Sequence, residues 1–146
     1  MKNLTNFQKQ FKNKTVLVTG HTGFKGAWLS AWLSLIGAKI IGVSLDEKNK
    51  NSHLDYLNFI KMHKDYRFDI CQYDRIKKCV IKNKPDFVFH LAAQSLVGRS
   101  YKDPLYTWKT NLIGTINLLN ALRFLNNKCN AVIITSDKCY KNLEIK

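Results

Sequence analysis

Two short stretches of the chain combine residue types and spacings that can do chemistry. The first, TGHTGFKG, places Gly20, Gly23 and Gly26 in a GxxGxxG pattern directly after an apolar run. In this order the glycines permit a tight turn, close approach of a diphosphate and close packing of the next helix, whose first amides attract anions. A purely structural turn is the alternative, but a strand before the glycines and a helix after them favour dinucleotide binding.

The second stretch, TSDKCY, brings Ser136, Asp137 and Lys138 directly after the apolar run 131–135. A carboxyl group beside an amine can act as an acid and a base, provided that their surroundings separate their proton affinities. In open α/β sheets, ligands bind beyond the carboxyl ends of the strands, so the position of these residues makes them candidates for catalysis. A solvated strand end without chemistry is the alternative interpretation.

The segments around these stretches alternate between strand and helix patterns. Continuous β-branched and apolar runs indicate strands buried on both faces, and apolar residues at helical spacings indicate the helices between them. We predict strands over 14–19, 38–44, 66–70, 86–93 and 130–135, and helices over 24–37, 54–61, 73–83 and 103–126. Because right-handed crossovers between parallel strands leave helices on both faces, we predict an α/β fold with a doubly wound, Rossmann-like parallel sheet.

Local signals place the ends of these helices. Gly37 is a C-terminal stop for the first helix, and Pro85 closes the helix before the fourth strand. Asp103 and Pro104 form a favourable N-cap and first-residue pair for the long helix, on which Asn111 could hold backbone near the site or make a plain interhelical hydrogen bond. The long helix carries an apolar stripe, which predicts packing through one face. The stripe consists of Leu105, Trp108, Leu112, Ile116, Leu119 and Leu122.

The composition narrows the class of protein. A chain of 146 residues with 45% hydrophobic residues fits one globular domain over 1–146. Neither a run of ~18 apolar residues nor a secretory signal is found, so we expect no membrane association and a cytoplasmic location. The net charge of +14 is spread along the chain, which favours a solvated basic surface over nucleic-acid binding. The four cysteines lack metal-ligand spacing, so we interpret them as free thiols and predict no metal site.

Residues near the end of the second strand bear on the choice between NAD and NADP. Ser44 closes that strand, Asp46 lies two residues further on within reach of a ribose hydroxyl, and no Arg is nearby for an extra phosphate. NAD is therefore favoured. Lys25 can add charge near a phosphate or be solvated, and His21 is interpreted as a loop residue. His90, flanked by apolar residues, is interpreted as a hydrogen-bonded core histidine and not as a catalyst.

Several stretches together, TGHTGFKG, HLAAQSLVGRSY, TNLIGTINLLNAL and TSDKCY, resemble the extended short-chain dehydrogenase/reductase superfamily. Within this superfamily, the sequence is similar to the CDP-glucose 4,6-dehydratase family over nearly the whole chain from Phe11 onward. The resemblance implies that NAD binds with its pyrophosphate on the glycine loop, its adenine near Asp69 and its nicotinamide at the mouth of the fourth strand. The implied cofactor residues are Gly20, Thr22, Gly23, Phe24, Lys25, Gly26, Ser44, Asp46, Asp69, Ile70, Leu91, Ala92, Ala93, Gln94 and Asn111.

The resemblance also implies a CDP-sugar substrate and a reaction, the conversion of CDP-glucose to CDP-4-keto-6-deoxyglucose in deoxysugar biosynthesis. In this family NAD⁺ takes hydride from carbon 4, water is lost across carbons 5 and 6, and the hydride returns to carbon 6. The resemblance assigns Ser136 to the carbon 4 oxygen, Asp137 as the acid at the leaving hydroxyl and Lys138 as the base at carbon 5. Related dTDP-sugar enzymes have Asp and Glu in this pair, so Lys138 favours the CDP-sugar branch. A lysine base needs a pKa below the ordinary ~10.4.

The superfamily's YxxxK pair, expected on the helix after the fifth strand, does not occur in these residues. Leu105 stands at the lysine position after Tyr101, and Glu144 stands there after Tyr140. We therefore expect a truncated, N-terminal portion without the substrate-binding part, which binds NAD weakly and turns over little or nothing. The resemblance allows a homodimer of the longer enzyme through the long helix. The alternatives are another NAD-dependent nucleotide-sugar epimerase or dehydratase, and a non-catalytic NAD-binding module.

Overall fold

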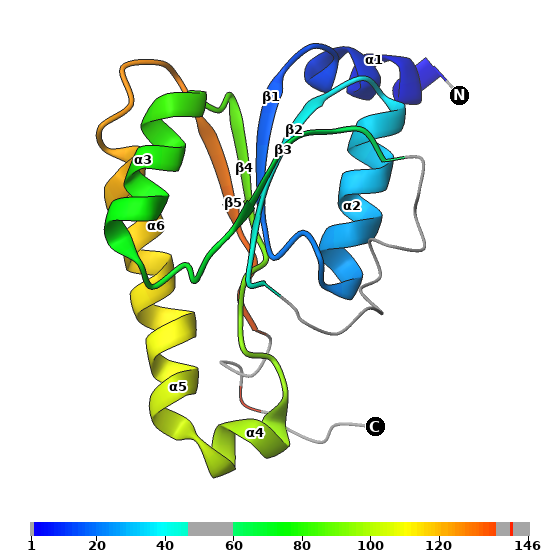
Figure 1. Ribbon diagram of the computed structural model, residues 1–146. Helices are drawn as coiled ribbons and strands as arrows, with labels where there is room; N and C mark the ends of the chain where they lie inside the picture. The colour runs from blue at the N-terminus through cyan, green and yellow to red at the C-terminus, as the bar shows by residue number, and fades with distance from the viewer. Residues whose placement is uncertain (1, 47–59, 137–140, 142–146) are drawn as a thin grey trace, which may run out of the picture.

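The computed structural model describes residues 2–46, 60–136 and 141 of the chain. Among these residues, five parallel strands form one sheet in the order β3-β2-β1-β4-β5 (Figure 1). They are β1 Thr15–Thr19, β2 Lys39–Ser44, β3 Met62–Arg67, β4 Phe87–His90 and β5 Asn130–Ile133. The connection from β3 past β2 and β1 to β4 reverses the strand order, so the predicted doubly wound sheet is confirmed.

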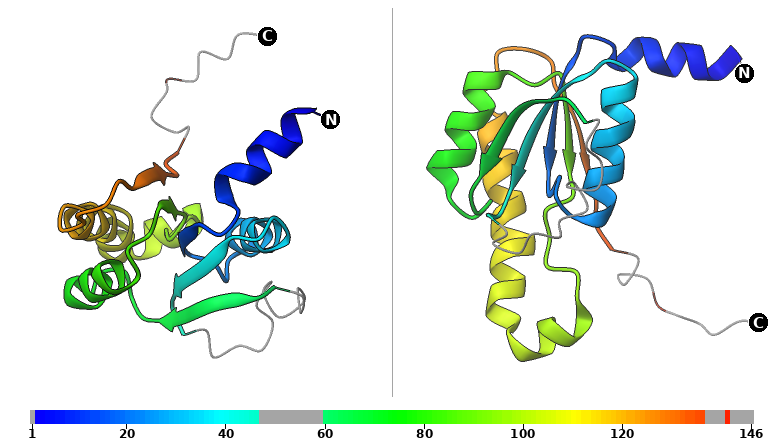
Figure 2. Two further views of the ribbon diagram at one scale, coloured as in Figure 1. Left: turned by 90° about the horizontal axis from the view of Figure 1, so that it is seen from above. Right: turned by 45° about the vertical axis from the view of Figure 1, so that its right-hand side comes forward.

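Helices cover both faces of this sheet. They are α1 Lys2–Phe11, α2 Phe24–Leu35, α3 Tyr73–Asn83, α4 Val97–Lys102, α5 Pro104–Trp108, the π-helix η1 Lys109–Ile113 and α6 Gly114–Leu122. α2 lies on one face, whereas α3 and α6 pack together on the other (Figures 1 and 2). α4 and α5 extend beyond the carboxyl ends of the strands (Figure 1). Within the described part of the chain, no helix has the length and apolarity that crossing a membrane requires.

Two hydrophobic cores hold the helices to the sheet. Successive residues of β1 face opposite sides, so Leu17 packs in the core with α3 and α6, while Val16 and Val18 pack on the side of α2. This burial on both faces explains why β1 has a continuous apolar sequence. Phe11, at the end of α1, packs against Phe87 with ring centroids 4.7 Å apart, which attaches α1 to the core on the α2 side.

The region of the third strand differs from the prediction. The strand predicted over 66–70 lies at Met62–Arg67, because β3 is an edge strand whose exposure alternates and whose sequence is therefore mixed. Phe68 still donates its N–H to the Ser44 carbonyl at 2.8 Å, just past the end of the strand. Of the helix predicted over 54–61, residues 54–59 lie outside the described residues, and residues 60 and 61 are not helical. α1 has no counterpart among the predicted helices.

The long helix differs in its continuity and in its buried face. Asp103 caps it as predicted, with Oδ1 accepting from the Tyr106 N–H at 3.0 Å, but the π-helix η1 separates α5 from α6. Gly114 lies where a Cβ would be only 2.5 Å from Cγ2 of Ile70, so small residues select the face that packs closely. The buried residues of η1 and α6 are Thr110, Gly114, Leu118 and Ala121. Five residues of the predicted stripe are instead 44% to 76% exposed: Leu105, Trp108, Leu112, Ile116 and Leu119.

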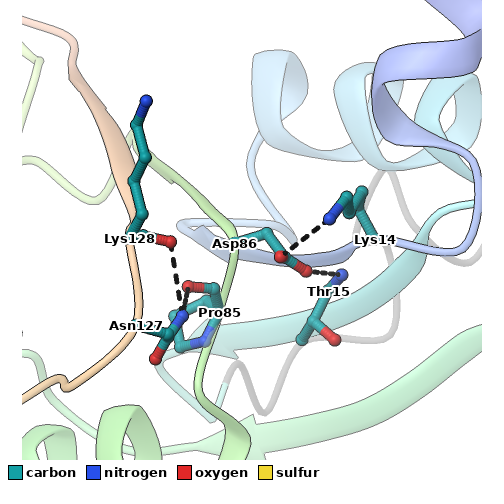
Figure 3. A network of polar contacts seen from close by, with 6 residues as sticks. All are labelled: Lys14, Thr15, Pro85, Asp86, Asn127 and Lys128. Atoms are coloured by element: carbon teal, nitrogen blue, oxygen red, sulfur yellow. Dashed lines mark hydrogen bonds and ion pairs between the residues drawn. The ribbon is translucent and has the colours of Figure 1, made fainter.

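A polar network joins the beginnings of three strands (Figure 3). Asp86, just before β4, accepts the N–H of Thr15 at 2.9 Å and pairs with the Lys14 ammonium at 3.2 Å. Asn127, ahead of β5, donates to the Pro85 carbonyl at 3.2 Å. These contacts fix β1, β4 and β5 relative to one another at the end of the sheet opposite the carboxyl ends of its strands.

Candidate functional site

A cleft of about 470 Å³ opens at the carboxyl ends of the strands. The turn after β1, the ends of β2, β3 and β4, and residues of α5 and η1 form its wall. This is the position at which open α/β sheets bind ligands. Of the predicted cofactor residues, the following line it: Gly20, Thr22, Gly23, Phe24, Lys25, Gly26, Ser44, Asp69, Ile70, Leu91, Ala92 and Ala93.

The turn between β1 and α2 requires glycine at two positions. Gly20 has a φ of 73°, and a Cβ there would lie 2.8 Å from the Ala92 nitrogen. Gly26 sits against the Gly20 carbonyl, which leaves no room for a Cβ. α2 has neither a side-chain cap at Gly23 nor an acidic residue in its first turn, so no such group neutralises its positive end beside the cleft. The turn can therefore present helix amides to an anion such as a diphosphate.

The end of β2 is joined to this turn by a pair of hydroxyl groups. Thr22 Oγ1 and Ser44 Oγ are 2.6 Å apart, and both side chains are buried or nearly so. Leu45 continues the cleft wall, whereas Asp46 is exposed and is not among the lining residues. Lys25 lines the cleft and adds a positive charge next to the start of α2. The structure thus brings Ser44 into the site but not Asp46.

The opposite wall of the cleft is built by the segment after β3. Asp69 and Ile70 line it, and Asp69 Oδ1 accepts the N–H of Cys71 at 2.8 Å. Asn117 of α6 donates to the carbonyls of Ile70 and Cys71, at 3.3 and 3.0 Å. Phe68 closes the wall below them and is only 6% exposed. These contacts give the cleft a rigid apolar side that suits a flat heterocycle.

Gln94 and Asn111 support the cleft from behind, since neither lines it. Asn111 Oδ1 accepts the N–H of Gln94 at 2.7 Å, and its Nδ2 donates to the Gln94 carbonyl at 3.0 Å. The Gln94 side chain donates to Thr107 Oγ1 at 3.0 Å and accepts the N–H of Leu96 at 2.7 Å. The backbone-holding contact expected for Asn111 is therefore present, and it ties the segment after β4 to η1.

His90 lies at the end of β4, is 2% exposed and has a partner at each ring nitrogen. Nδ1 is 2.6 Å from Thr19 Oγ1, and Nε2 is 2.9 Å from Thr115 Oγ1. Thr115 donates to the Asn111 carbonyl at 2.7 Å, so we assign the ring proton to Nε2. Thr19 accepts the Ala92 N–H at 3.3 Å and donates to Nδ1. Burial lowers the pKa of His90 to about 4, which agrees with this neutral tautomer, and the predicted core role is confirmed.

The carboxyl end of β5 reaches the same cleft. Ile134 and Thr135 line the cleft, and Ser136 is exposed immediately after them. Asp137 and Lys138 lie outside the described residues. Of the predicted catalytic residues, the structure thus describes only Ser136, one residue beyond the cleft lining.

Part of the cleft wall carries no sequence motif. Phe68, Ile134 and Thr135 belong to it because they follow strands, and this position is the signal that marks them. Tyr106 and Thr110 come from the long helix, at a helical spacing of four residues. Within the described part of the chain, the additional lining residues are Val43, Leu45, Phe68, Ser95, Tyr106, Thr110, Ile134 and Thr135.

The three described cysteines form no disulfide. Cys71, Cys79 and Cys129 are free thiols as predicted, and Cys139 lies outside the described residues. Burial raises the pKa of Cys71 and of Cys79 to about 11, so both thiols stay protonated at neutral pH. Over residues 2–46, 60–136 and 141, no group of three or more His, Cys, Asp or Glu side chains could hold a metal ion.

The reversed strand order, the glycine turn and the cleft define a Rossmann-type dinucleotide-binding domain of the short-chain dehydrogenase/reductase superfamily. The chain belongs to the GDP-mannose 4,6-dehydratase family, whose sequence model matches residues 17–145.

Individual relatives agree with this assignment. The chain is 41% identical over 134 residues to CDP-glucose 4,6-dehydratase of Salmonella typhimurium (strain LT2), which covers 92% of this chain and 37% of that enzyme. The UDP-glucose-4-epimerase of Stenotrophomonas maltophila, solved with bound NAD and formylated UDP-arabinopyranose, has a TM-score of 0.78 at 26% identity, covering 90% of this chain and 40% of that one. The Brucella ovis UDP-glucose 4-epimerase in complex with NAD has a TM-score of 0.68 at 27% identity, over 82% and 35% of the two chains. The chain spans about a third of the length of the curated relatives it matches.

Proposed function

We propose that this chain is the NAD-binding part of a nucleotide-sugar 4,6-dehydratase that converts CDP-glucose to CDP-4-keto-6-deoxyglucose. The observation that carries the proposal is the cleft itself, which runs from an uncapped helix end at the glycine turn to the carboxyl end of β5. The similarity to CDP-glucose 4,6-dehydratase supports the choice of sugar nucleotide. A cytoplasmic location goes with this proposal.

The residues of the cleft fit a dinucleotide in one direction. The amides after Gly23 would bind the pyrophosphate with Lys25 beside them, and the apolar wall at Ile70 would hold the adenine. Ala92 and Ala93 leave space for the nicotinamide at the end of β4. Among the residues that the structure describes, no arginine lines the cleft near the end of β2, which favours NAD over its 2′-phosphorylated form.

Bound NAD⁺ would supply reversible hydride transfer, which turns carbon 4 of the sugar into a ketone and makes the proton on carbon 5 acidic. In this proposal Ser136 orients the carbon 4 oxygen, Lys138 removes the proton from carbon 5, and Asp137 protonates the hydroxyl that leaves carbon 6. Lys138 must be neutral to accept a proton, so the proposal requires surroundings that lower its pKa. The two groups then act as the base and the acid of one elimination, which requires that their surroundings separate their pKa values.

The exposed apolar stripe on α5, η1 and α6 suggests how two copies would meet. Trp108, Leu112 and Ile116 are each at least 46% exposed, and single exposed apolar residues are common but a continuous row is not. This row belongs to the stripe that the sequence predicted to be the packing face of the helix. We propose that it forms the interface of a homodimer.

An NAD-dependent nucleotide-sugar epimerase is the second candidate, because the two solved structures described above are epimerases with the same fold. The complete reading frame that contains these residues should be expressed and incubated with NAD and CDP-glucose in heavy water. A dehydratase releases water and takes up solvent deuterium at carbon 5, both of which mass spectrometry detects. Inversion at carbon 4 without mass change would identify an epimerase, and NAD binding without either reaction would identify a binding module.

The acid role has its own test in the same protein. Replacing Asp137 with Asn removes the proton donor but keeps the shape of the side chain, so water loss should fall by about 10² or more. NAD affinity should stay nearly constant. Unchanged dehydration in this variant would remove Asp137 from the mechanism.

A further inference from the structure

His21 belongs to the glycine turn, yet its side chain is fully buried, with 0% exposure. Its ring lies over Gly42 of β2, where a Cβ would be 2.6 Å from Cδ2 and 2.7 Å from Cε1 of the imidazole. Ordinary contacts of a Cβ begin at 3.4 Å, so the ring and a side chain at position 42 exclude each other. Gly42 therefore provides the space that lets the turn bury a large residue against the sheet.

The imidazole also reaches the edge strand beyond β2. His21 Nε2 is 3.0 Å from Oδ1 of Asp65 in β3, although the two are not aligned as a hydrogen bond. Oδ2 of Asp65 accepts from Nη2 of Arg67 at 2.7 Å, which holds the carboxylate in place. Burial lowers the pKa of His21, Asp65 opposes this shift, and Arg67 reinforces it, so the ring is neutral at pH 7.

The residues on either side of His21 are attached to the sheet as well. The N–H of Gly20 donates to the Val43 carbonyl at 2.7 Å, and the Thr22 hydroxyl is 2.6 Å from that of Ser44. Three consecutive residues thus connect the turn to β2 and β3. His21 does not line the cleft, so it acts on a ligand only through the backbone that follows it.

We propose that His21 is a positioning residue for the dinucleotide: wedged over Gly42 and placed against Asp65, it fixes the turn whose next amides bind the diphosphate. The inference rests on the proposed NAD binding. It predicts that substitutions at the wedge change affinity for the diphosphate but not for the adenosine half, because the adenine wall at Ile70 is built by other residues.

Three variants of the 146-residue chain test the wedge, namely His21→Ala, Gly42→Ala and the two combined. Calorimetric titration should show NAD binding about tenfold weaker in each single variant, with adenosine binding unchanged. In the double variant the alanine at position 42 no longer meets the imidazole, and only the flexible end of Met62, whose Cε would be 2.6 Å from the same Cβ, has to move aside. Its NAD affinity should therefore be no lower than that of His21→Ala. Additive losses would show that the His21 imidazole and position 42 do not act through their contact, and would refute the proposal.

A second readout separates positioning from mere folding. His21→Gln keeps a neutral polar group near Asp65 but cannot take up a proton. Because burial lowers the pKa of His21, NAD affinity of the unsubstituted chain should hold through the ordinary range of imidazole titration and fall only at more acidic pH, where a proton on the buried ring disturbs the turn. The Gln variant should keep its affinity further into the acid range. A His21→Ala variant that binds NAD normally, or that loses adenosine equally, would refute the inference. An unsubstituted chain that binds no NAD would instead refute NAD binding by this part of the protein, on which the inference rests.

Discussion

Replacing Gly26 with Ala should damage both the stability of the fold and its affinity for NAD. The new methyl group would lie 2.8 Å from the Gly20 carbonyl carbon and 2.8 Å from the Cα of His21, and closer still to the Gly20 carbonyl oxygen. All of these are backbone atoms, which cannot move aside as the end of a flexible side chain can. The start of α2 must therefore shift away from the turn.

Two effects of opposite sign set the magnitude. Overpacking of this kind costs about 1–3 kcal/mol in the free energy of unfolding. Replacing a glycine inside a helix with alanine returns about 0.5–1 kcal/mol through backbone entropy and helix propensity. The overpacking is the larger effect, so we expect a net loss of about 1–2 kcal/mol. Because α2 then presents its amides at the wrong distance, NAD affinity should fall about tenfold or more.

Gly98→Ala is the matched control. Gly98 lies inside α4, and a Cβ there would have no atom within 4 Å, so this variant should show only the helix gain of about 0.5–1 kcal/mol. Urea unfolding followed by circular dichroism measures the stability of both variants, and calorimetric titration measures their affinity for NAD. A Gly26→Ala variant that matches Gly98→Ala in both measurements would refute the steric reasoning for the turn.

Three further predictions concern stability, protonation and assembly. The free energy of unfolding should fall by up to about 3 kcal/mol as the pH drops from 6.5 to 4, because His90 binds a proton in the unfolded chain but stays neutral when it is buried in the fold. An NMR titration that gives the folded imidazole a pKa of 6.5 would contradict this reasoning. Asp86→Asn should lower the free energy of unfolding in urea by about 1 kcal/mol, because the Thr15 N–H loses a charged acceptor. Lys14→Met should lower it by less than about 0.5 kcal/mol, because the Lys14 side chain is 50% exposed. Equal losses would show that the ion pair matters more than the backbone contact. Trp108→Glu should abolish the proposed homodimer in sedimentation velocity, while Leu35→Glu on α2 should leave it intact, and a dimer that survives the first change would exclude this surface.

The interior of the sheet could be predicted from the sequence because its physical cause is local. β1 is buried on both faces, and this burial requires a continuous apolar run, which is directly recognisable in the sequence. α3 begins and ends at the predicted residues, Tyr73 and Asn83, because a strict apolar spacing and a following proline set its limits. The edge strand β3 has no such signal, since one side of it faces solvent and its residues are mixed.

For the long helix, the periodicity of apolar residues did not determine which face is buried. Its most apolar face, through Trp108 and Leu112, is exposed, and the face with Gly114 is buried because only small residues let the helix approach Ile70. A hydrophobic pattern identifies an apolar surface without saying whether this chain or another copy covers it.

Some features of the candidate site could likewise be predicted from the sequence, and others could not. The glycine spacing and the strand ends locate the cleft, since both are properties of neighbouring residues in the sequence. The burial of His21 depends on Gly42 and Asp65, which are distant in sequence and meet only in the folded sheet. No local pattern marks such a contact, so the interpretation of His21 as an ordinary loop residue misses its burial.

In the proposed complex, the glycine turn holds the diphosphate of NAD at the start of α2 while the nicotinamide reaches the end of β5. A crystal structure of the chain grown with NAD would show whether the cofactor binds in this way. We predict pyrophosphate oxygens within hydrogen-bond distance of the amides after Gly23, and the nicotinamide ring beside Ala92 and Thr135. A dinucleotide bound elsewhere, or bound in the cleft with its two ends exchanged, would contradict the account.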